Sequence, residues 1–357
     1  MITTRYLARA YLVATVAALV ALSTLFLILD FTDRVKFYGG AGWLPAVLQL
    51  YACKLAQVVW QLAPAAAGFG GAIAMSGLRR TGEITAFRAL GRGPVTFALP
   101  VAAVALALGG ALFLAEDPVI VPARAKAEEI SVLRFHRWGD WGTYHSARRW
   151  FRGKNGRLYH VGRPAGRGFS GVTILDLTPD FRLARRIDAR RMEPQGARQW
   201  KLFDATVRSF GPAGAPMRER EVKELVEPFS GDTRLFRVEP GRPDEIRRSD
   251  LPRQIALRRK LGLPSREFQL SLYDREGYQL AGVPAALIGL ALALRKKRRG
   301  HLTAAISEGF VITIGLWGLS AISHTLALGG HLSPVVAGWL PFAVTSLVAA
   351  SALRLVR

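Results

Sequence analysis

The segment AYLVATVAALVALSTLFLIL, residues 10–29, contains no charged residue. A helix needs about 20 mainly apolar residues to cross the roughly 30 Å hydrocarbon core of a membrane, because each residue adds about 1.5 Å. The segment is longer than the apolar core of a usual signal peptide, and the DFTDR that follows it, residues 30–34, offers no small-x-small cleavage site. We therefore predict a retained membrane anchor.

Five further apolar segments predict five more membrane helices, at residues 55–78, 95–115, 278–294, 302–328 and 332–355. The first of these contains Pro64 and the glycines Gly68, Gly70 and Gly71, which permit close contacts between membrane helices. The spans form two groups of three, because a long polar region separates the third span from the fourth.

This polar region is rich in arginine and contains short apolar segments broken by Gly, Pro and Asp. RLYHV (157–161), VTILDL (172–177) and WKLF (200–203) have the length of strands and turn-like flanks, which indicates an antiparallel β domain. The sequence therefore predicts an α-helical membrane protein with six transmembrane helices and an inserted all-β domain. The expected regions are 1–116 for helices 1–3, 117–275 for the β domain and 276–357 for helices 4–6.

Basic residues in the short connections predict the orientation. Cytoplasmic loops of membrane proteins carry an excess of Lys and Arg, and long exported domains cross regardless of their charge. With six spans, the basic short segments all fall on one side, namely Arg5 and Arg9, the arginines of 79–92, RKKRR at 295–299, and Arg354 with Arg357. The sequence thus predicts a multi-pass inner-membrane protein with a periplasmic β domain.

Composition excludes several classes of function. The chain carries 49 Lys and Arg residues against 26 Asp and Glu residues, a formal charge of +23. Nucleic acid, anionic lipid and an acidic substrate all attract such a charge. The arginines lie in the short loops and in the middle segment, and no basic groove interleaved with aromatic residues is apparent, so we expect no nucleic-acid partner.

Catalytic and metal-binding signatures are also missing. The single cysteine, Cys53, excludes an intramolecular disulfide and a cysteine-cluster metal site. His136, His145 and His160 lack the spacing of metal ligands, so we predict no metal site and no catalytic residue. The sequence has no GxxxxGK[ST] motif, so this chain is not itself an ATPase of the P-loop class.

The connection RRTGEITAFRALGRGP, residues 79–94, predicts a short helix at about 81–91. Thr81 is a candidate cap, and Glu83 would favour the positive end of the helix. Gly91 and Pro94 supply the stop.

One stripe of this short helix is apolar, because Ile84, Phe87 and Leu90 follow helical spacing. A helix of under three turns is marginal alone in water, so the stripe needs another surface. That surface is either the chain's own membrane helices or a partner protein, and spacing leaves both open.

Charged residues near the spans have two interpretations. An ionisable group at the bilayer centre costs about 2.5–3.5 kcal/mol on insertion scales, so such groups mark functional sites. Glu308 and His324, however, lie near helix ends, where we favour contact with the interface. Arg34 and Lys36 follow the first span and either anchor the helix end or meet a ligand.

In the 79–94 connection, EI (83–84) and ALG (89–91) follow LAP (62–64) of the second span. These segments resemble the coupling-helix region of the LptF/LptG family of lipopolysaccharide export permeases, although Gly82 stands where a serine is common. Further similar segments run through the whole chain: RYLAR (5–9), LDFTD (29–33), WFR (150–152), GVTI (171–174), WKL (200–202), LSP (332–334) and WLP (339–341). LDFTD is more similar to the LptG members than to the LptF members.

The resemblance implies a permease subunit of an ABC-type exporter that extracts lipopolysaccharide from the inner membrane. It implies a periplasmic β-jellyroll, an LptF-like permease partner, an LptB-like ATPase dimer that holds ATP and Mg, and an LptC-like periplasmic acceptor. No cofactor is then expected on this chain. Membrane lipid surrounds the complex.

The resemblance also implies roles for the residues singled out above. The coupling helix would contact the ATPase through Glu83, Ile84, Phe87 and Leu90. Lys36, with Arg34 in support, would meet the phosphates of the lipid headgroup.

Three alternatives stay open at this point. The first is that the chain is the LptF paralogue of the same complex. The second is another ABC permease with a periplasmic domain, which would normally have four spans. A membrane-anchored enzyme acting on envelope polymers is the third alternative, although the sequence offers no convincing nucleophile or acid pair.

Overall fold

The computed structural model describes residues 2–40, 42–135, 149–153, 157–162, 164–165, 168–195, 199–211, 216–228, 238, 241–261, 263–295 and 301–356. The chain forms two compact units. The membrane unit comprises Met1–Trp138, Pro243–Ala256 and Pro264–Arg357. The β unit comprises Gly139–Arg242 and Leu257–Leu263.

Among the described residues, six helices of the membrane unit are long and apolar enough to cross a membrane, which confirms the six predicted spans. They are α1 (Ile2–Arg34), α2 (Trp43–Arg80), α4 (Val95–Ala115) with its continuation, α8 (Arg266–Leu280) followed by α9 (Gly282–Arg295), α10 (Leu302–Leu328) and α11 (Pro334–Arg354). The shorter elements are η1 (Val35–Phe37), α3 (Glu83–Ala89), η5 (Pro243–Glu245) and α7 (Leu251–Lys260).

The first four spans are longer than the apolar segments that predicted them, and two of these, the third and the fourth, extend into the region expected to hold the β domain. The third continues through a π-helical turn, η2 (Glu116–Ile120), into α5 (Val121–Phe135), and the fourth begins with α8. These extensions lie within the 117–275 region expected to hold the β domain. Both extensions are polar on one side. Helix α5, for example, buries only a stripe that includes Ala127 and Ile130 against α2. A search for continuous apolar segments therefore does not identify these helices.

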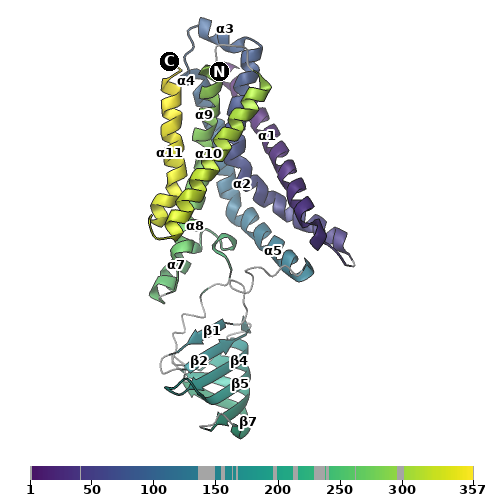
Figure 1. The fold of residues 1–357 in the computed structure, drawn as a ribbon, viewed down its shortest axis with the longest axis vertical. Coiled ribbons are helices and arrows are strands. Elements are labelled where there is room, and N and C mark those ends of the chain that lie inside the picture. The colour runs from purple at the N-terminus through teal and green to yellow at the C-terminus, as the bar shows by residue number, and fades with distance from the viewer. Residues whose placement is uncertain are drawn as a thin grey trace. The chain divides into compact units, whose positions relative to one another are not determined.

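Both chain termini lie at the same end of the membrane unit as α3 (Figure 1). We call this end the α3 end. The end of α1, the start of α2 and the end of α5 lie at the opposite end, which we call the α5 end. The predicted placement of the basic termini and the 79–94 connection on one side agrees with this arrangement, whereas residues 296–299 of the third basic loop lie outside the described residues.

Glycines allow α2 and α9 to pack closely at the centre of the membrane unit. A Cβ atom on Gly71 would collide with the carbonyl oxygen of Ala286, and one on Gly289 would collide with that of Gly68. The glycines of the second span therefore serve helix packing, as their position in an apolar segment suggested.

The β unit is an antiparallel sheet, which confirms the inserted all-β domain. Its strands are β1 (Arg149–Arg152), β2 (Arg157–Val161), β3 (Pro164–Ala165), β4 (Gly168–Leu177), β5 (Leu183–Pro194), β6 (Gln199–Phe210) and β7 (Pro216–Pro228). The strand order is β1-β2-β4-β5-β6-β7, with β3 paired to β4. These strands thus pair in sequence order, without the crossovers of Greek keys among the described strands.

The sheet is rolled over its apolar face. Arg185 pairs with Ser209 at one end of β6, and Glu227 pairs with Trp200 at the other end. These positions would lie about 30 Å apart on a flat sheet, at roughly 3.3 Å per residue. Arg185 nevertheless donates a hydrogen bond of 3.0 Å to Glu227, so the end of β7 curls back to β5.

A row of irregular positions explains the bend. Gly171 of β4, Arg190 of β5 and Asp204 of β6 are all skipped in the strand pairing and lie in register with one another. Gly171 and Asp204 have φ values of 66° and 49°, a left-handed conformation that increases local bending. The described strands therefore form a rolled antiparallel sheet, and the jellyroll that the resemblance implies stays a prediction.

Candidate functional site

The short helix α3 connects α2 to α4 and is flanked by glycines with positive φ. Gly82 occupies the N-cap with φ 81°, and Gly91 follows the helix with φ 75°. Thr81 does not cap the helix, contrary to the prediction, because the left-handed Gly82 takes that position without a side-chain bond. The hydroxyl of Thr81 instead lies 2.8 Å from a carboxylate oxygen of Glu83, which holds that side chain at the start of the helix.

The apolar stripe of α3 faces the chain's own membrane helices for two of its three residues. Ile84 is only 1% exposed and lies in a core with residues of α1, α2, α4 and α9. Phe87 packs edge to face on Phe97, with ring centroids 5.8 Å apart. Leu90 is 76% exposed. Ile84 and Phe87 therefore hold α3 in place, and the surface of α3 that a partner can reach includes Leu90.

Two arginines tie α3 and α2 to the end of α9. Arg79 donates hydrogen bonds to the carbonyl oxygens of Ala293 (2.5 Å) and Leu294 (3.1 Å), and Arg88 donates one to Leu294 (3.3 Å). The last carbonyls of a helix lack partners within the helix, and the helix dipole favours cations there. These hydrogen bonds link the first group of three spans to the second. From the sequence, the two arginines were identified only as charges in a loop.

A charged cluster lies at the α5 end, around Asp30 of α1. Arg34 Nε lies 2.6 Å and Lys54 Nζ 2.5 Å from the Asp30 carboxylate. The hydroxyl of Tyr51 donates a hydrogen bond of 2.8 Å to the same carboxylate. The hydroxyl of Tyr38 lies 3.3 Å from the hydroxyl of Tyr51. Predicted site residue Arg34 is thus already paired within the chain.

Lys36, the other predicted headgroup residue, lies on η1 and is exposed. Its ammonium group lies 5.2 Å from the ring centroid of Phe37, a cation–π contact. The ion pair between Asp30 and Lys54 was not predicted. Their signal was present, since each is a charge at the edge of an apolar span at the same end of the unit.

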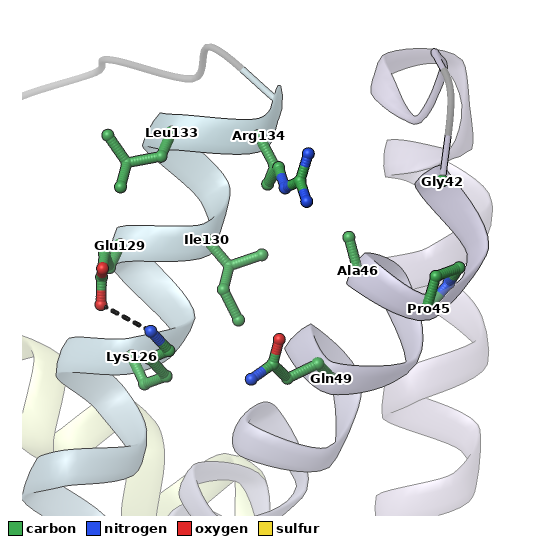
Figure 2. Close-up of a pocket in the computed structure, with 9 residues that line it drawn as sticks. All are labelled: Gly42, Pro45, Ala46, Gln49, Lys126, Glu129, Ile130, Leu133 and Arg134. Atoms are coloured by element: carbon green, nitrogen blue, oxygen red, sulfur yellow. Dashed lines mark hydrogen bonds and ion pairs between the residues drawn. The ribbon is translucent and has the colours of Figure 1, made fainter.

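A cleft of about 300 Å³ opens between α2 and α5 near this cluster (Figure 2). Ile130 and Arg134 of α5 point across the gap toward Ala46 and Gln49 of α2. The remaining lining residues are Gly42, Pro45, Lys126, Glu129 and Leu133, with Lys126 and Glu129 paired at 3.0 Å. Apolar and cationic groups together suit an amphipathic molecule with an anionic head.

A buried ionic contact joins the third and fourth spans. Glu116 of η2 and Arg275 of α8 are both buried, and Arg275 Nε lies 3.4 Å from Glu116 Oε1. Arg275 also donates hydrogen bonds to the carbonyl oxygens of Ile246 (2.9 Å) and Pro243 (2.7 Å). The contact fixes the segment 243–250 to the spans, and nothing in the hydropathy pattern predicts it.

The remaining polar candidates have structural surroundings. His324 Nε2 lies 2.9 Å from a carboxylate oxygen of Asp274, so it contacts α8, and Glu308 is half-buried on α10. His160 packs against Trp150. His136 and His145 lie outside the described residues, within which no group of three or more His, Cys, Asp or Glu side chains could hold a metal ion.

The family model described as "Lipopolysaccharide export system permease LptF/LptG" matches residues 5–355. Among curated proteins no match is found.

Proposed function

The chain belongs to the LptF/LptG family of lipopolysaccharide export permeases, and from this premise we propose that it takes the LptG place in an inner-membrane exporter. Members of the family are permease subunits and not enzymes, with ATP hydrolysis on a separate subunit. We propose that this chain pairs with an LptF-like permease and an LptB-like ATPase dimer, which binds ATP and Mg. Extracted lipopolysaccharide then passes to an LptC-like periplasmic protein.

One observation carries the proposal beyond the family. The membrane unit places α3 at one end and a cationic cluster with an amphipathic cleft at the other. A transporter driven by an ATPase needs a docking element on the cytoplasmic side. An anionic lipid from the outer leaflet needs cations at the level of its headgroup on the far side. Both requirements are met within one six-helix unit.

The outer surfaces of α1 and α10 suit both the lipid and the partner permease. Large apolar side chains are exposed on both helices, among them Val13, Val20, Leu29, Val311, Ile314 and Ile322. Soluble proteins seldom expose such continuous apolar surface, but acyl chains and neighbouring spans cover it in a membrane. We propose that the second permease faces these helices across a lipid-filled cavity.

We propose that α3 contacts the ATPase through Glu83 and Leu90. Ile84 and Phe87 do not take part in this contact directly. They pack against the chain's own helices and so hold α3 in position for it. Lys36, which is exposed, meets the lipid headgroup directly, and Arg34 assists it from the cluster around Asp30. The LDFTD segment at 29–33 favours the LptG place over the LptF place.

Affinity purification of the tagged chain from native membranes tests the proposal. An ATPase and a second six-span permease should co-purify with the wild type. Glu83→Lys and Leu90→Asp should reduce recovery of the ATPase, because the first places a cation at a helix N-terminus and the second a charge in an apolar contact. Arg92→Ala, an exposed change beyond α3, is the control.

Two outcomes contradict the proposal at different levels. Recovery of the chain without any ATPase would reject the exporter assignment. Full ATPase recovery and unchanged lipid-dependent hydrolysis with both α3 variants would reject α3 as the contact and leave the assignment in place.

A further inference from the structure

A proline interrupts the hydrogen bonding of α2. Pro64 has no N–H group, so the carbonyl oxygen of Trp60, four residues earlier, loses its donor within the helix. No water reaches the hydrocarbon core to replace that donor, so another part of the protein has to supply one. The side chain of Gln279 does so, because its amide nitrogen lies 3.0 Å from the Trp60 oxygen. Gln279 is 2% exposed, and this bond accounts for a buried amide in the fourth span.

A second polar contact holds the same turn of α2. The hydroxyl of Tyr278 donates a hydrogen bond of 2.6 Å to the carbonyl oxygen of Gln61. The same hydroxyl accepts a hydrogen bond of 3.2 Å from the indole nitrogen of Trp317 on α10. The ring of Trp60 stacks on that of Tyr278, with centroids 5.4 Å apart. Helices α8 and α10 are thereby joined to α2 just before Pro64.

The fourth span is interrupted where it meets Pro64. Helix α8 ends at Leu280 and α9 begins at Gly282, with Ala281 in a turn between them. Gly282 lies against Pro64, because a Cβ atom on Gly282 would be 3.4 Å from the Cα atom of Pro64. Two irregular positions, one in each group of three spans, therefore face each other.

Packing differs on the two sides of Pro64. The second part of α2, residues 65–80, is fixed to α9, because glycines bring the two backbones into contact. Near Pro64, by contrast, lie two cavities of about 170 and 270 Å³, and Gln279 lines the first and Tyr278 the second. The first part of α2, residues 43–63, therefore has room to move about Pro64, and the second part does not.

We propose that Pro64 is a hinge about which the first part of α2 moves, and that Gln279 and Tyr278 are positioning residues that hold it in the conformation described here. The first part contains one wall of the cleft between α2 and α5, whereas the second part leads to α3. The hinge thus separates the proposed ATPase contact from the end proposed to meet the lipid. The proposal deepens the proposed function and rests on it for the purpose of the movement, whereas the hinge itself is tested on this chain alone.

Thermal unfolding of the full chain tests the role of Gln279. Gln279→Met keeps the approximate shape but removes the donor, and it should lower the unfolding temperature by roughly 2–5 °C. Pro64→Ala returns an N–H donor to the Trp60 carbonyl within the helix, so Gln279→Met should cost at most about half as much in that background. Gln57→Met, which alters an amide of α2 outside this contact, is the control and should change little. Equal losses in both backgrounds, or failure of Pro64→Ala to recover a Gln279→Met variant that does not fold, would overturn the assignment.

Distances between spin labels on the full chain in lipid nanodiscs test the hinge. The single cysteine is first removed as Cys53→Ser, so that labels attach only at introduced cysteines. One pair of labels, at the exposed Leu48 and Val335, reports the first part of α2 against the start of α11. A second pair, at Gly77, which has open space beside it, and at the exposed Leu355, reports the second part of α2 against the end of α11.

The distance distribution of the first pair should be wider than that of the second pair in the wild type. Pro64→Ala should narrow the first distribution, because a helix with its full set of hydrogen bonds bends less, and Gln279→Met should widen it, because one of the two holding bonds is lost. The second distribution should stay the same in both variants. A first distribution of equal width in the wild type, Pro64→Ala and Gln279→Met would overturn the hinge.

The reconstituted exporter tests what the hinge does. Pro64→Ala should lower the amount of lipopolysaccharide transferred per ATP hydrolysed, while recovery of the ATPase stays normal. Normal transfer together with a narrowed first distribution would overturn the role of the hinge in transport. Absence of transfer by the wild type would reject the proposed function and leave the hinge measurements on the chain alone unaffected.

Discussion

Arg275 of α8 lies 3.4 Å from Glu116 of η2, and both side chains are buried in the membrane unit. The two residues are far apart in the sequence and belong to different groups of three spans. The guanidinium of Arg275 also bonds to the backbone of the segment 243–250, where the chain re-enters the membrane unit. Asp117, next to Glu116, accepts a hydrogen bond of 2.7 Å from the amide of Arg248 in the same segment.

The first prediction concerns the stability of this contact. Removing one partner leaves a buried charge without compensation, which costs about 3–5 kcal/mol. Glu116→Gln and Arg275→Gln should therefore each lower the unfolding temperature of the detergent-solubilised protein relative to the wild type. The double variant Glu116→Leu with Arg275→Met should recover only the part of the loss that comes from the unpaired partner, because the carbonyl oxygens of Ile246 and Pro243 still lose their donor.

Lys126→Ala is the matched control, since its ion pair with Glu129 is exposed and should contribute less than about 1 kcal/mol. Single variants at positions 116 and 275 that unfold like the wild type would show that the pair has no structural role.

The second prediction concerns the packing of α2 on α9. Gly71→Ala should lower the abundance and thermal stability of the protein, because the new methyl group would collide with the backbone of Ala286. Overpacking of this kind costs roughly 1–3 kcal/mol. Gly77→Ala lies on the same helix with nothing within 4 Å of the new atom and should be tolerated. Alanine has a higher helix propensity than glycine, so equal loss in both variants would show that the close contact at Gly71 does not explain the effect.

The six spans could be predicted from the sequence, but the polar contacts between them could not. The six helices follow from apolar length alone, whereas α5 and α8 combine a polar side with a narrow buried stripe and escape hydropathy. The stripe on α3 was recognised, but spacing does not say which surface covers it, and the structure assigns Ile84 and Phe87 to the chain's own core.

Contacts distant along the chain were beyond sequence reasoning. Arg185 and Glu227 meet because the sheet bends along one row of unpaired residues, and a single sequence shows strands without their curvature. In the Asp30 cluster, Arg34 was identified as a candidate, but neither its partner Asp30 nor Lys54, the second cation on that carboxylate, was predicted.

The third prediction concerns the pH dependence of the β unit. Burial alone would raise the pKa of Asp188, but hydrogen bonds from Arg186 and Thr173 outweigh burial and hold this pKa below the ordinary value of 3.8. A carboxylate with a lowered pKa stabilises the fold above its unfolded pKa and loses this contribution as the pH falls through the folded value. The β unit should therefore lose stability below about pH 3.8.

Hydrogen exchange of β4 and β5 in the full-length protein, corrected for intrinsic rates, measures this effect between pH 5 and pH 3. Asp188→Asn should reduce the change by up to about 1 kcal/mol, as expected for a half-exposed ion pair. A pH profile of Asp188→Asn identical to that of the wild type would contradict the assignment.

The fourth prediction concerns Lys36. A photoreactive residue at position 36 should crosslink lipopolysaccharide in an active complex, and Lys36→Asp should reduce transport with normal protein abundance. Lys36→Ala should have a small effect, because one basic residue near a membrane surface contributes about 1 kcal/mol and is screened by salt. Reduced abundance with normal transport per molecule would instead assign Lys36 to anchoring the helix end, and an active complex without a crosslink would remove it from the site.

ATP-driven release of lipopolysaccharide measures the proposed activity most directly. The chain, its co-purified permease and its ATPase are reconstituted into vesicles that contain lipopolysaccharide, together with the periplasmic acceptor protein outside. We predict that lipopolysaccharide appears on the acceptor only when ATP is hydrolysed, and that an ATPase variant that binds but does not cleave ATP abolishes the transfer. Hydrolysis of ATP without any lipopolysaccharide on the acceptor, or transfer of equal amounts without ATP, would contradict the assignment of this chain as an export permease.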